Sequence, residues 1–349
     1  MDSDSGRVVV GIDTGGTSNN ATVLDPSKGF LVDRLVETPS RVTEGPEVAI
    51  DAMARALDNI LDLTGIAPEA VRGVGLDTPG PASANGVISS KGATNFAQPA
   101  WRGFDVRGAL EVRLGLPVVY NNDANAAALY AHSVRYGAKA AGHSSVSAIV
   151  GTGLGGGVVE SGRIVRGAAG MAGEFGHVQI PMHGLLAQGQ PLPVCNCGFV
   201  GDAESIASLT GIERNLLPYW LTRFENHELG RVADPKEAAK LVRGYGERED
   251  PLALAIFEQQ AMAIGRLFTI AANFTDPDTY FLGGGVVEST PTFRQWFLGK
   301  VREHTALREE QARVASLALV PDRDMAGARG SAIAALDALQ APIRVRTSL

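Results

Sequence analysis

Apolar residues in the first part of the chain occur as short β-branched runs and as one longer periodic stretch. Between Ile50 and Ile60 they recur at spacings of 3, 4 and 3, which is the pattern of an amphipathic helix that begins near Pro46. The predicted strands of this part are residues 7–12, 20–25, 30–37, 71–77 and 117–120. The predicted helices are residues 46–63 and the alanine-rich 124–134. The small polar residues between the first two strands indicate a hairpin.

The same order of elements restarts about 140 residues later. Strands are expected at residues 145–150, 156–160, 163–166 and 279–282. Helices are expected at residues 203–219, 236–244, 251–274 and 327–340. The restart predicts an internal duplication, with two related halves. Residues 181–194, with Gly, Gln and three prolines, are typical of a surface loop.

Composition places the chain among ordinary globular proteins. Its 349 residues, about twice a typical domain, suggest two domains or one large one. The content of 45% hydrophobic and 20% charged residues argues against disorder. The 31 basic and 38 acidic residues give a net charge of −7, which disfavours nucleic acid or an anionic membrane as partner. No apolar stretch reaches the ~20 residues of a membrane span, and residues 1–6 lack the features of a signal peptide. A cytosolic location is therefore expected.

Glycine is abundant, at 42 residues, and two glycine-rich turns follow strands at equivalent places in the two halves. They are Asp13–Thr17 (Asp-Thr-Gly-Gly-Thr) and Gly151–Gly157 (Gly-Thr-Gly-Leu-Gly-Gly-Gly). Backbone N–H groups of such turns can approach a phosphate, and Asp13 could hold a divalent cation through water. For the first turn alone, a hairpin with glycine at positive φ explains the sequence equally well. For the second turn alone, the glycines could serve packing only. The recurrence favours two turns that hold the phosphates of a nucleotide. The run Gly283–Gly285 is either a strand end close to a nucleoside or a strand-to-helix turn.

Asp123 follows an apolar strand and begins a helix, in the segment Asn-Asn-Asp-Ala-Asn (residues 121–125). An isolated aspartate in this place is usually a helix cap. The carboxyl end of a strand is also where the sites of α/β proteins gather. An aspartate there can accept the proton of a substrate hydroxyl that attacks phosphorus. Helix cap and general base are therefore both open interpretations.

Two overlapping sets of polar residues occur in the second half. Glu174, His177 and Glu204 could hydrogen-bond several hydroxyls of a polyol, or form surface ion pairs. His177 also combines with Cys195, Cys197 and either Asp202 or Glu204 into a set of zinc ligands. Two buried thiols with an unrelated histidine are the alternative. The two cysteines, separated by one residue, are too close for ordinary disulfide geometry.

In this order, the motifs resemble those of the ROK family of sugar kinases, within the actin-like ATPase superfamily. The resemblance covers residues 7–340. It rests on the two glycine turns with Gly11 and Ile12, Asn121–Asn125, Gly162, Gly170, Glu174–His177, Cys195–Gly198, Glu204 and Gly283–Gly285. It implies an α/β fold of two ribonuclease-H-like domains with an interdomain cleft. The expected domains are a small one of residues 1–122, closed by the C-terminal helix in 326–349, and a larger one of residues 123–325 that contains a metal-site insertion.

The resemblance also implies an activity, the ATP-dependent phosphorylation of a hexose on its 6-hydroxyl, with glucose as the expected hexose and Asp123 as catalytic base. The sugar-binding residues that it implies are Asn95, Asn122, Asp123, Glu174, His177 and Glu204. The ATP-binding residues that it implies are Asp13, Gly15, Gly16, Thr17, Thr152, Gly153 and Gly284, with Asp13 also on Mg²⁺. The expected partners are a hexose and a nucleotide, with neither nucleic acid nor membrane, and the expected assembly is a homodimer.

The chain departs from the family pattern in its zinc site. ROK zinc sites use a histidine and three cysteines, and one ring nitrogen of the histidine binds the metal while the other faces the sugar. Asp202 stands here in the position of the third cysteine. Zinc is therefore expected on His177, Cys195, Cys197 and Asp202, held more weakly than by three thiolates, or not at all.

Two alternative functions accompany the resemblance. One is a kinase for another hexose: N-acetylglucosamine, N-acetylmannosamine, fructose, mannose or allose. The other is a non-enzymatic, sugar-sensing regulator. Regulators of this family carry a DNA-binding helix-turn-helix before the first strand, whereas six residues precede Arg7 here and the net charge is negative, which disfavours that alternative. The choice of hexose, and the use of polyphosphate in place of ATP, stay open.

Overall fold

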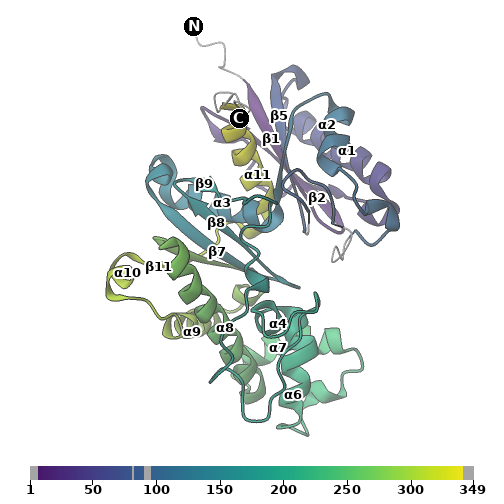
Figure 1. Cartoon of the computed structure of the whole chain (residues 1–349). Helices are drawn as coiled ribbons and strands as arrows, with labels where there is room; N and C mark the ends of the chain where they lie inside the picture. Colours follow the sequence, from purple (N-terminus) through teal and green to yellow (C-terminus); the bar gives the residue numbers. More distant parts are fainter. Residues whose placement is uncertain (1–6, 81, 90–95, 341–349) are drawn as a thin grey trace. The chain divides into compact units, whose positions relative to one another are not determined.

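A computed structural model describes residues 7–80, 82–89 and 96–340 of the chain (Figure 1). Within these ranges the chain folds into two compact units. Of these residues, 7–80, 82–89, 96–131, 166–171 and 322–340 form the first unit, and 132–165 and 172–321 form the second. One helix, α3 (Asp123–Tyr136), contains the boundary between them.

The first unit is built on a sheet in which an antiparallel hairpin is extended by parallel strands. The strand order is β3-β2-β1-β5-β6, and β4 also pairs with β2. β1 and β2 are antiparallel, whereas β1, β5 and β6 are parallel. The strands are β1 (Val8–Thr14), β2 (Ser18–Asp25), β3 (Gly29–Phe30), β4 (Glu37–Pro39), β5 (Val71–Thr78) and β6 (Val118–Asn122). The carboxyl ends of β1, β5 and β6 therefore meet at one edge of this sheet.

Helices cover both faces of this first sheet. These helices are α1 (Pro46–Thr64), α2 (Val106–Leu114) and α11 (Arg323–Gln340). Alternate β1 side chains such as Val8 and Ile12 join the core formed with α1 and α2, whereas Val9 packs with the alanines of α11. On the α11 face a Cβ at Gly11 or Gly75 would lie 1.9 Å from a carbonyl oxygen of the helix. These two glycines therefore allow α11 to lie directly on the strands.

The second unit repeats this arrangement. Its sheet has the order β11-β10-β7-β8-β9, with β7, β8 and β9 antiparallel and β7, β10 and β11 parallel. The strands are β7 (Ser144–Val150), β8 (Leu154–Glu160), β9 (Arg163–Ile164), β10 (Thr279–Gly284) and β11 (Ser316–Leu319). β7 corresponds to β1, β10 to β5 and β11 to β6. This match of order and direction confirms the predicted internal duplication.

A long helix, α8 (Pro251–Thr275), forms the centre of the second core and is apparent in Figure 1. The Asp250 side chain accepts a hydrogen bond from Ala253 N and so caps the start of α8. The other helices are α4 (Glu204–Ala207), α5 (Leu209–Gly211), α6 (Leu217–Leu221), α7 (Pro235–Gly246), α9 (Pro291–Glu303) and α10 (Glu309–Val314). Among the helices of the described ranges, none has the length and apolar character to cross a bilayer.

Two of the predicted elements were wrong. The strand expected at residues 30–37 is replaced by the short strands β3 and β4, which both pair with β2. The helix expected at residues 203–219 is divided into α4, α5, a π-helical turn and α6. The break occurs at Ser208, which is extended and whose hydroxyl accepts a hydrogen bond from Gly211 N, so that it begins a new helix.

Candidate functional site

The carboxyl-end edge of the first sheet gathers the polar residues that the sequence singled out in this unit. Asp13 of β1 is in register with Asp77 of β5, and Asp77 with Asn121 of β6. Side chains in register on neighbouring strands point to the same face of the sheet. The segment from Asn122 to Asp123 continues directly from the end of β6 into α3. The structure thus brings Asp13 and Asp123 to the same edge.

Asp123 is half-buried and begins α3. Its Oδ1 accepts a hydrogen bond from Ala124 N at 2.7 Å, and Asn122 Oδ1 accepts from the same N–H at 3.0 Å. The positive end of the helix dipole stabilises a carboxylate in this place. Cap and base are therefore compatible roles, since the cap fixes the carboxylate at the edge of the sheet.

Asp77 is a site residue that the sequence analysis missed. Its side chain is completely buried, and its Oδ2 accepts a hydrogen bond from Ser331 Oγ of α11 at 2.7 Å. Burial, and then the negative charge of Asp13, hold the pKa of Asp77 well above its usual range. As two carboxylates the pair could not hydrogen-bond, and Asp77 Oδ1 would be buried without a donor. Burial raises the pKa of Asp13 as well. Because two buried carboxylates repel each other, we expect the pair to hold one proton, on Asp77, and to carry one negative charge.

We expect Asp77→Asn to stabilise the protein at neutral pH by about 1 kcal/mol, because the amide keeps both hydrogen bonds without a buried acid. An acid with a raised pKa in the folded state contributes stability fully below its unfolded pKa of about 3.9, and this contribution is lost as pH rises through the folded pKa. The gain of the variant should therefore grow with pH. Urea unfolding at several pH values measures it, with exposed Asp58→Asn of α1 as control. A gain that does not change with pH would contradict the shared proton.

The turn between β1 and β2 carries Gly15, Gly16 and Thr17. Gly15 N donates to Ser18 O at 2.8 Å, which closes the turn. Neither glycine has a positive φ, so the backbone conformation does not require them. A Cβ at Gly15 would make only an ordinary contact, 3.4 Å from Ser18 O. At Gly15 the fold of the turn therefore does not need a glycine, and close approach of a phosphate would explain one there.

The equivalent turn of the second unit joins β7 to β8. Gly151 N donates to Gly153 O at 2.9 Å, and neither glycine has a positive φ. A Cβ at Gly151 would meet nothing within 4 Å, whereas one at Gly153 would lie 2.6 Å from Glu204 Oε2. Gly153 is thus explained by packing, and Gly151, next to Thr152, is left for a ligand.

Gly284, the residue expected near a nucleoside, has a structural explanation. It has a φ of 86°, and a Cβ there would lie 2.2 Å from Val150 O of the neighbouring strand. A short 3₁₀ turn begins at the next residue, Gly285. The strand-to-helix alternative accounts for the glycine, and its contact with ATP stays a prediction.

Glu174, His177 and Glu204 lie in the second unit, all three partly exposed. Glu174 precedes the 3₁₀ turn Phe175–His177. Burial, and to a lesser degree the charge of Glu204, raises the pKa of Glu174. Glu204 begins α4, and its Oε2 accepts a hydrogen bond from Leu154 N at 2.8 Å.

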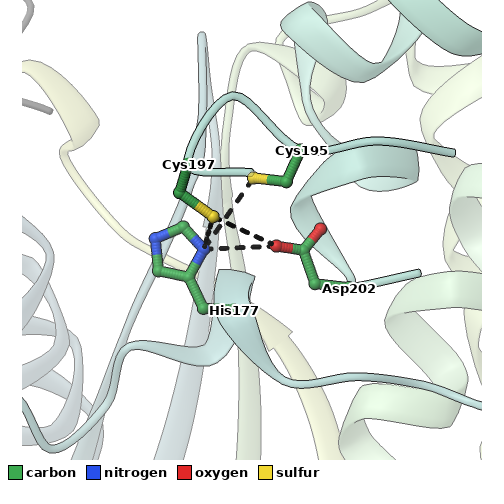
Figure 2. Close-up of side chains that lie close together, drawn as sticks. All are labelled: His177, Cys195, Cys197 and Asp202. Carbon is green, nitrogen blue, oxygen red and sulfur yellow. Dashed lines mark hydrogen bonds and ion pairs between the residues drawn. The ribbon is translucent and has the colours of Figure 1, made fainter. Parts of the chain in front are cut away.

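His177, Cys195, Cys197 and Asp202 form one cluster, with one potential ligand atom of each within 4.8 Å of all the others (Figure 2). His177 Nδ1 lies 3.3 Å from Asp202 Oδ2, 3.6 Å from Cys197 Sγ and 3.9 Å from Cys195 Sγ. Tetrahedral zinc with bonds of 2.0–2.3 Å separates its ligand atoms by roughly 3.3–3.8 Å. The donor types and spacings fit zinc, and Asp202 rather than Glu204 is the fourth member of the cluster.

The charges of the cluster are tightly coupled. A hydrogen bond with Asp202 raises the pKa of His177 to about 9. Burial disfavours the charged form of Asp202, yet hydrogen bonds from His177, Cys195 and Ser205 together lower its pKa. Burial also raises the pKa of the Cys195 thiol, which donates to Glu204 Oε1 at 3.3 Å. These interactions favour a protonated His177, and a cation bound by the cluster would take the place of that proton.

The expected site residues fall into two groups, each within its own unit. The first unit contains Asp13, Gly15, Gly16, Thr17, Asn122 and Asp123; the second contains Thr152, Gly153, Glu174, His177, Cys195, Cys197, Asp202, Glu204 and Gly284. Asn95 lies outside the described residues. Besides Asp77, the sequence analysis missed the contacts that join Glu204 and Thr210 to the turn after β7, because residues far apart in the chain make them.

A sequence model of the ROK family matches residues 9–338 of this chain. A protein named glucokinase from Halalkalibacterium halodurans is 33% identical over 303 residues, 86% of this chain and 86% of the relative. N-acetyl-D-glucosamine kinases are among the further relatives, at 28–30% identity.

Solved structures agree with these sequence matches. The ROK hexokinase from Thermus thermophilus has a TM-score of 0.73 and 30% identity, with 95% of this chain and 99% of that chain covered. A ROK family glucokinase from Streptomyces griseus, in complex with glucose and AMPPNP, has a TM-score of 0.65 and 27% identity, with 93% and 98% covered. The likeness confirms the α/β fold class predicted above, two domains of the actin-like ATPase type.

Proposed function

The chain belongs to the ROK family, and from this premise we propose that it is an ATP-dependent kinase that phosphorylates the 6-hydroxyl of a hexose, with glucose as substrate. The observation that carries the proposal is the position of Asp123. This half-exposed carboxylate sits at the start of α3, on the sheet edge that also carries Asp13 and the Gly15–Thr17 turn. Glucose is preferred because the relatives named above include glucokinases. A cytosolic location, expected from the composition, and a homodimer, expected from the resemblance, remain predictions.

Asp123 acts in this proposal as the general base. Its hydrogen bond from Ala124 N fixes the carboxylate, and it takes the proton of the 6-hydroxyl as that oxygen attacks the terminal phosphorus of ATP. The oxygen–phosphorus bond to the sugar forms while the bond to ADP breaks, and ADP leaves with the electron pair. Asn122, beside it, is available to orient the sugar through a hydroxyl hydrogen bond.

The two glycine turns hold the nucleotide in this proposal. Their backbone N–H groups, the Thr17 and Thr152 hydroxyls and the space beside Gly151 suit the phosphates. Asp13 would hold Mg²⁺, which neutralises charge on the transferring phosphate when it is bound. Because the pair with Asp77 carries one negative charge, Asp13 keeps a carboxylate for that purpose.

Glu174, His177 and Glu204 are proposed to bind the sugar hydroxyls. The four-residue cluster would hold zinc, which would fix the ring of His177 through Nδ1 and leave Nε2 for the sugar. Asp202 replaces a thiolate as ligand, so we propose a site that binds zinc more weakly than three cysteines with histidine would.

A coupled assay of ADP release over a panel of sugars tests the proposal. We expect turnover with glucose, and the panel includes mannose, allose, fructose, N-acetylglucosamine and N-acetylmannosamine. Running the panel with and without a zinc chelator measures how far the KM for the sugar depends on the metal. We expect this KM to rise on chelation. Preference for an N-acetylated sugar would replace glucose as substrate, and no turnover on any sugar would overturn the kinase.

A further inference from the structure

A path of hydrogen bonds within the second unit connects the metal cluster to the turn Gly151–Leu154. It begins at Asp202, which is completely buried and uses its two oxygens differently. Oδ2 faces His177 Nδ1, whereas Oδ1 accepts a hydrogen bond from Ser205 N at 2.9 Å in α4. The Ser205 hydroxyl donates in return to Asp202 O at 2.6 Å. A movement of Asp202 toward a metal therefore acts directly on the first turn of α4.

The residues of α4 and just after it support the glycine turn. Leu154 N donates to Glu204 Oε2 at 2.8 Å. The N–H groups of Leu209 and Thr210 donate to the first two carbonyl oxygens of the turn, at 3.0 and 3.1 Å. The Thr210 hydroxyl adds a further bond at 2.8 Å. The shape of Gly151–Leu154 thus depends on the position of α4.

The segment between the two ends is itself firmly held. The Ser208 hydroxyl donates to Glu204 O at 2.7 Å and accepts from Gly211 N at 2.9 Å. Gln260 Nε2 of α8, a buried side chain, donates to Ala207 O at 3.0 Å. Hydrogen bonds therefore connect Asp202 to the turn without a gap.

We propose that Asp202 is a positioning residue that couples metal binding in the cluster to nucleotide binding at the turn Gly151–Leu154. The inference rests on the proposed function, which places zinc in the cluster and phosphates at the turn. Zinc gathers its ligands around one centre, which would order Asp202, α4 and the turn together. A nucleotide that binds an ordered turn loses less conformational freedom and binds more tightly. A cysteine at this position would hold zinc but would offer Ser205 N no comparable acceptor, so the coupling is a property of the aspartate.

Titration calorimetry with AMPPNP on the full chain tests the coupling. We expect zinc-loaded protein to bind AMPPNP about five- to tenfold more tightly than zinc-free protein, and AMPPNP to raise the zinc affinity by the same factor. Equal AMPPNP affinities with and without zinc, or no binding of zinc, would overturn the inference.

Two substitutions of Asp202 separate its roles. Asp202→Asn keeps an acceptor for Ser205 N but is a poor zinc ligand, so its zinc affinity should fall at least tenfold. Its AMPPNP affinity should equal that of zinc-free wild type. Asp202→Cys should bind zinc as tightly as wild type or more so, while zinc changes its AMPPNP affinity less than twofold. Full coupling in Asp202→Cys would overturn the role of the Ser205 bond.

Variants at the far end of the path leave the metal ligands intact. Thr210→Val removes the hydroxyl bond to the turn and should weaken the coupling, whereas Thr210→Ser should keep it. Thr222→Val removes a similar hydroxyl-to-carbonyl bond, to Tyr219 O, away from the path and serves as control. Unchanged coupling in Thr210→Val would contradict the path.

Hydrogen exchange at the Leu154 amide gives a readout that needs no nucleotide. We expect zinc to slow exchange there in wild type and not in Asp202→Cys. If zinc slows exchange but AMPPNP does not bind, the proposed function fails while the link between cluster and turn stands. If AMPPNP binds but zinc leaves exchange and affinity unchanged, the inference alone fails.

Discussion

Asp123→Asn is expected to lower kcat by roughly 10²- to 10⁴-fold, the usual contribution of a positioned general base. The asparagine side chain can still accept the hydrogen bond from Ala124 N, so the start of α3 should keep its structure. It can no longer take the proton of an attacking hydroxyl. The coupled ADP assay measures kcat, and calorimetry with glucose should find a sugar affinity within a few-fold of wild type.

A matched substitution distinguishes loss of the base from loss of a helix cap. Asp105 caps α2 in the same unit, with Oδ1 accepting from Gly108 N at 2.8 Å, and is absent from the proposed site. Asp105→Asn should leave kcat unchanged. If Asp123→Asn keeps near-normal turnover, Asp123 is a cap and the base must be sought elsewhere.

The alternation and periodicity of apolar residues were sufficient to predict most of the fold. β1, β5, β7 and β10 are short, largely apolar runs that are buried on both faces, and such runs are recognisable without knowledge of their partners. The repeat of these elements gave the duplication that the two sheets then confirmed. Edge elements were harder, because β3, β4 and β11 are short and have weak patterns of their own.

Where the sequence pattern failed to predict the structure, the hydrogen bonds of single side chains explain the difference. Ser208 ends one helix and caps the next, so a stretch that reads as one amphipathic helix becomes several. Asp77 lies among apolar strand residues, and nothing next to it in the sequence reveals that register sets it beside Asp13. Such pairs depend on strand register and on the helix above, here through Ser331 of α11, and these are properties of the folded chain.

Gly151→Val is expected to weaken AMPPNP binding by at least about tenfold without lowering thermal stability, because a backbone turn that approaches a phosphate closely tolerates no side chain. Among the described residues, the added Cβ would meet no atom within 4 Å beyond the chain neighbours of Gly151, and Gly151 has no positive φ, so we expect the fold to accept a side chain there. Calorimetry with AMPPNP and with glucose, together with thermal unfolding, measures the three effects. Glucose affinity should stay unchanged.

Two further glycines serve as comparisons that distinguish a glycine needed for ligand binding from one needed for packing. At Gly153 a Cβ would lie 2.6 Å from Glu204 Oε2, so Gly153→Ala should disturb the turn and lower stability as well as affinity. At Gly299 in α9 a Cβ again meets nothing, and Gly299→Ala should change neither affinity, since no ligand is expected there. Normal AMPPNP affinity in Gly151→Val would mean that only solvent occupies the space beside Gly151. The proposed role of the turn after β7 in phosphate binding would then be wrong.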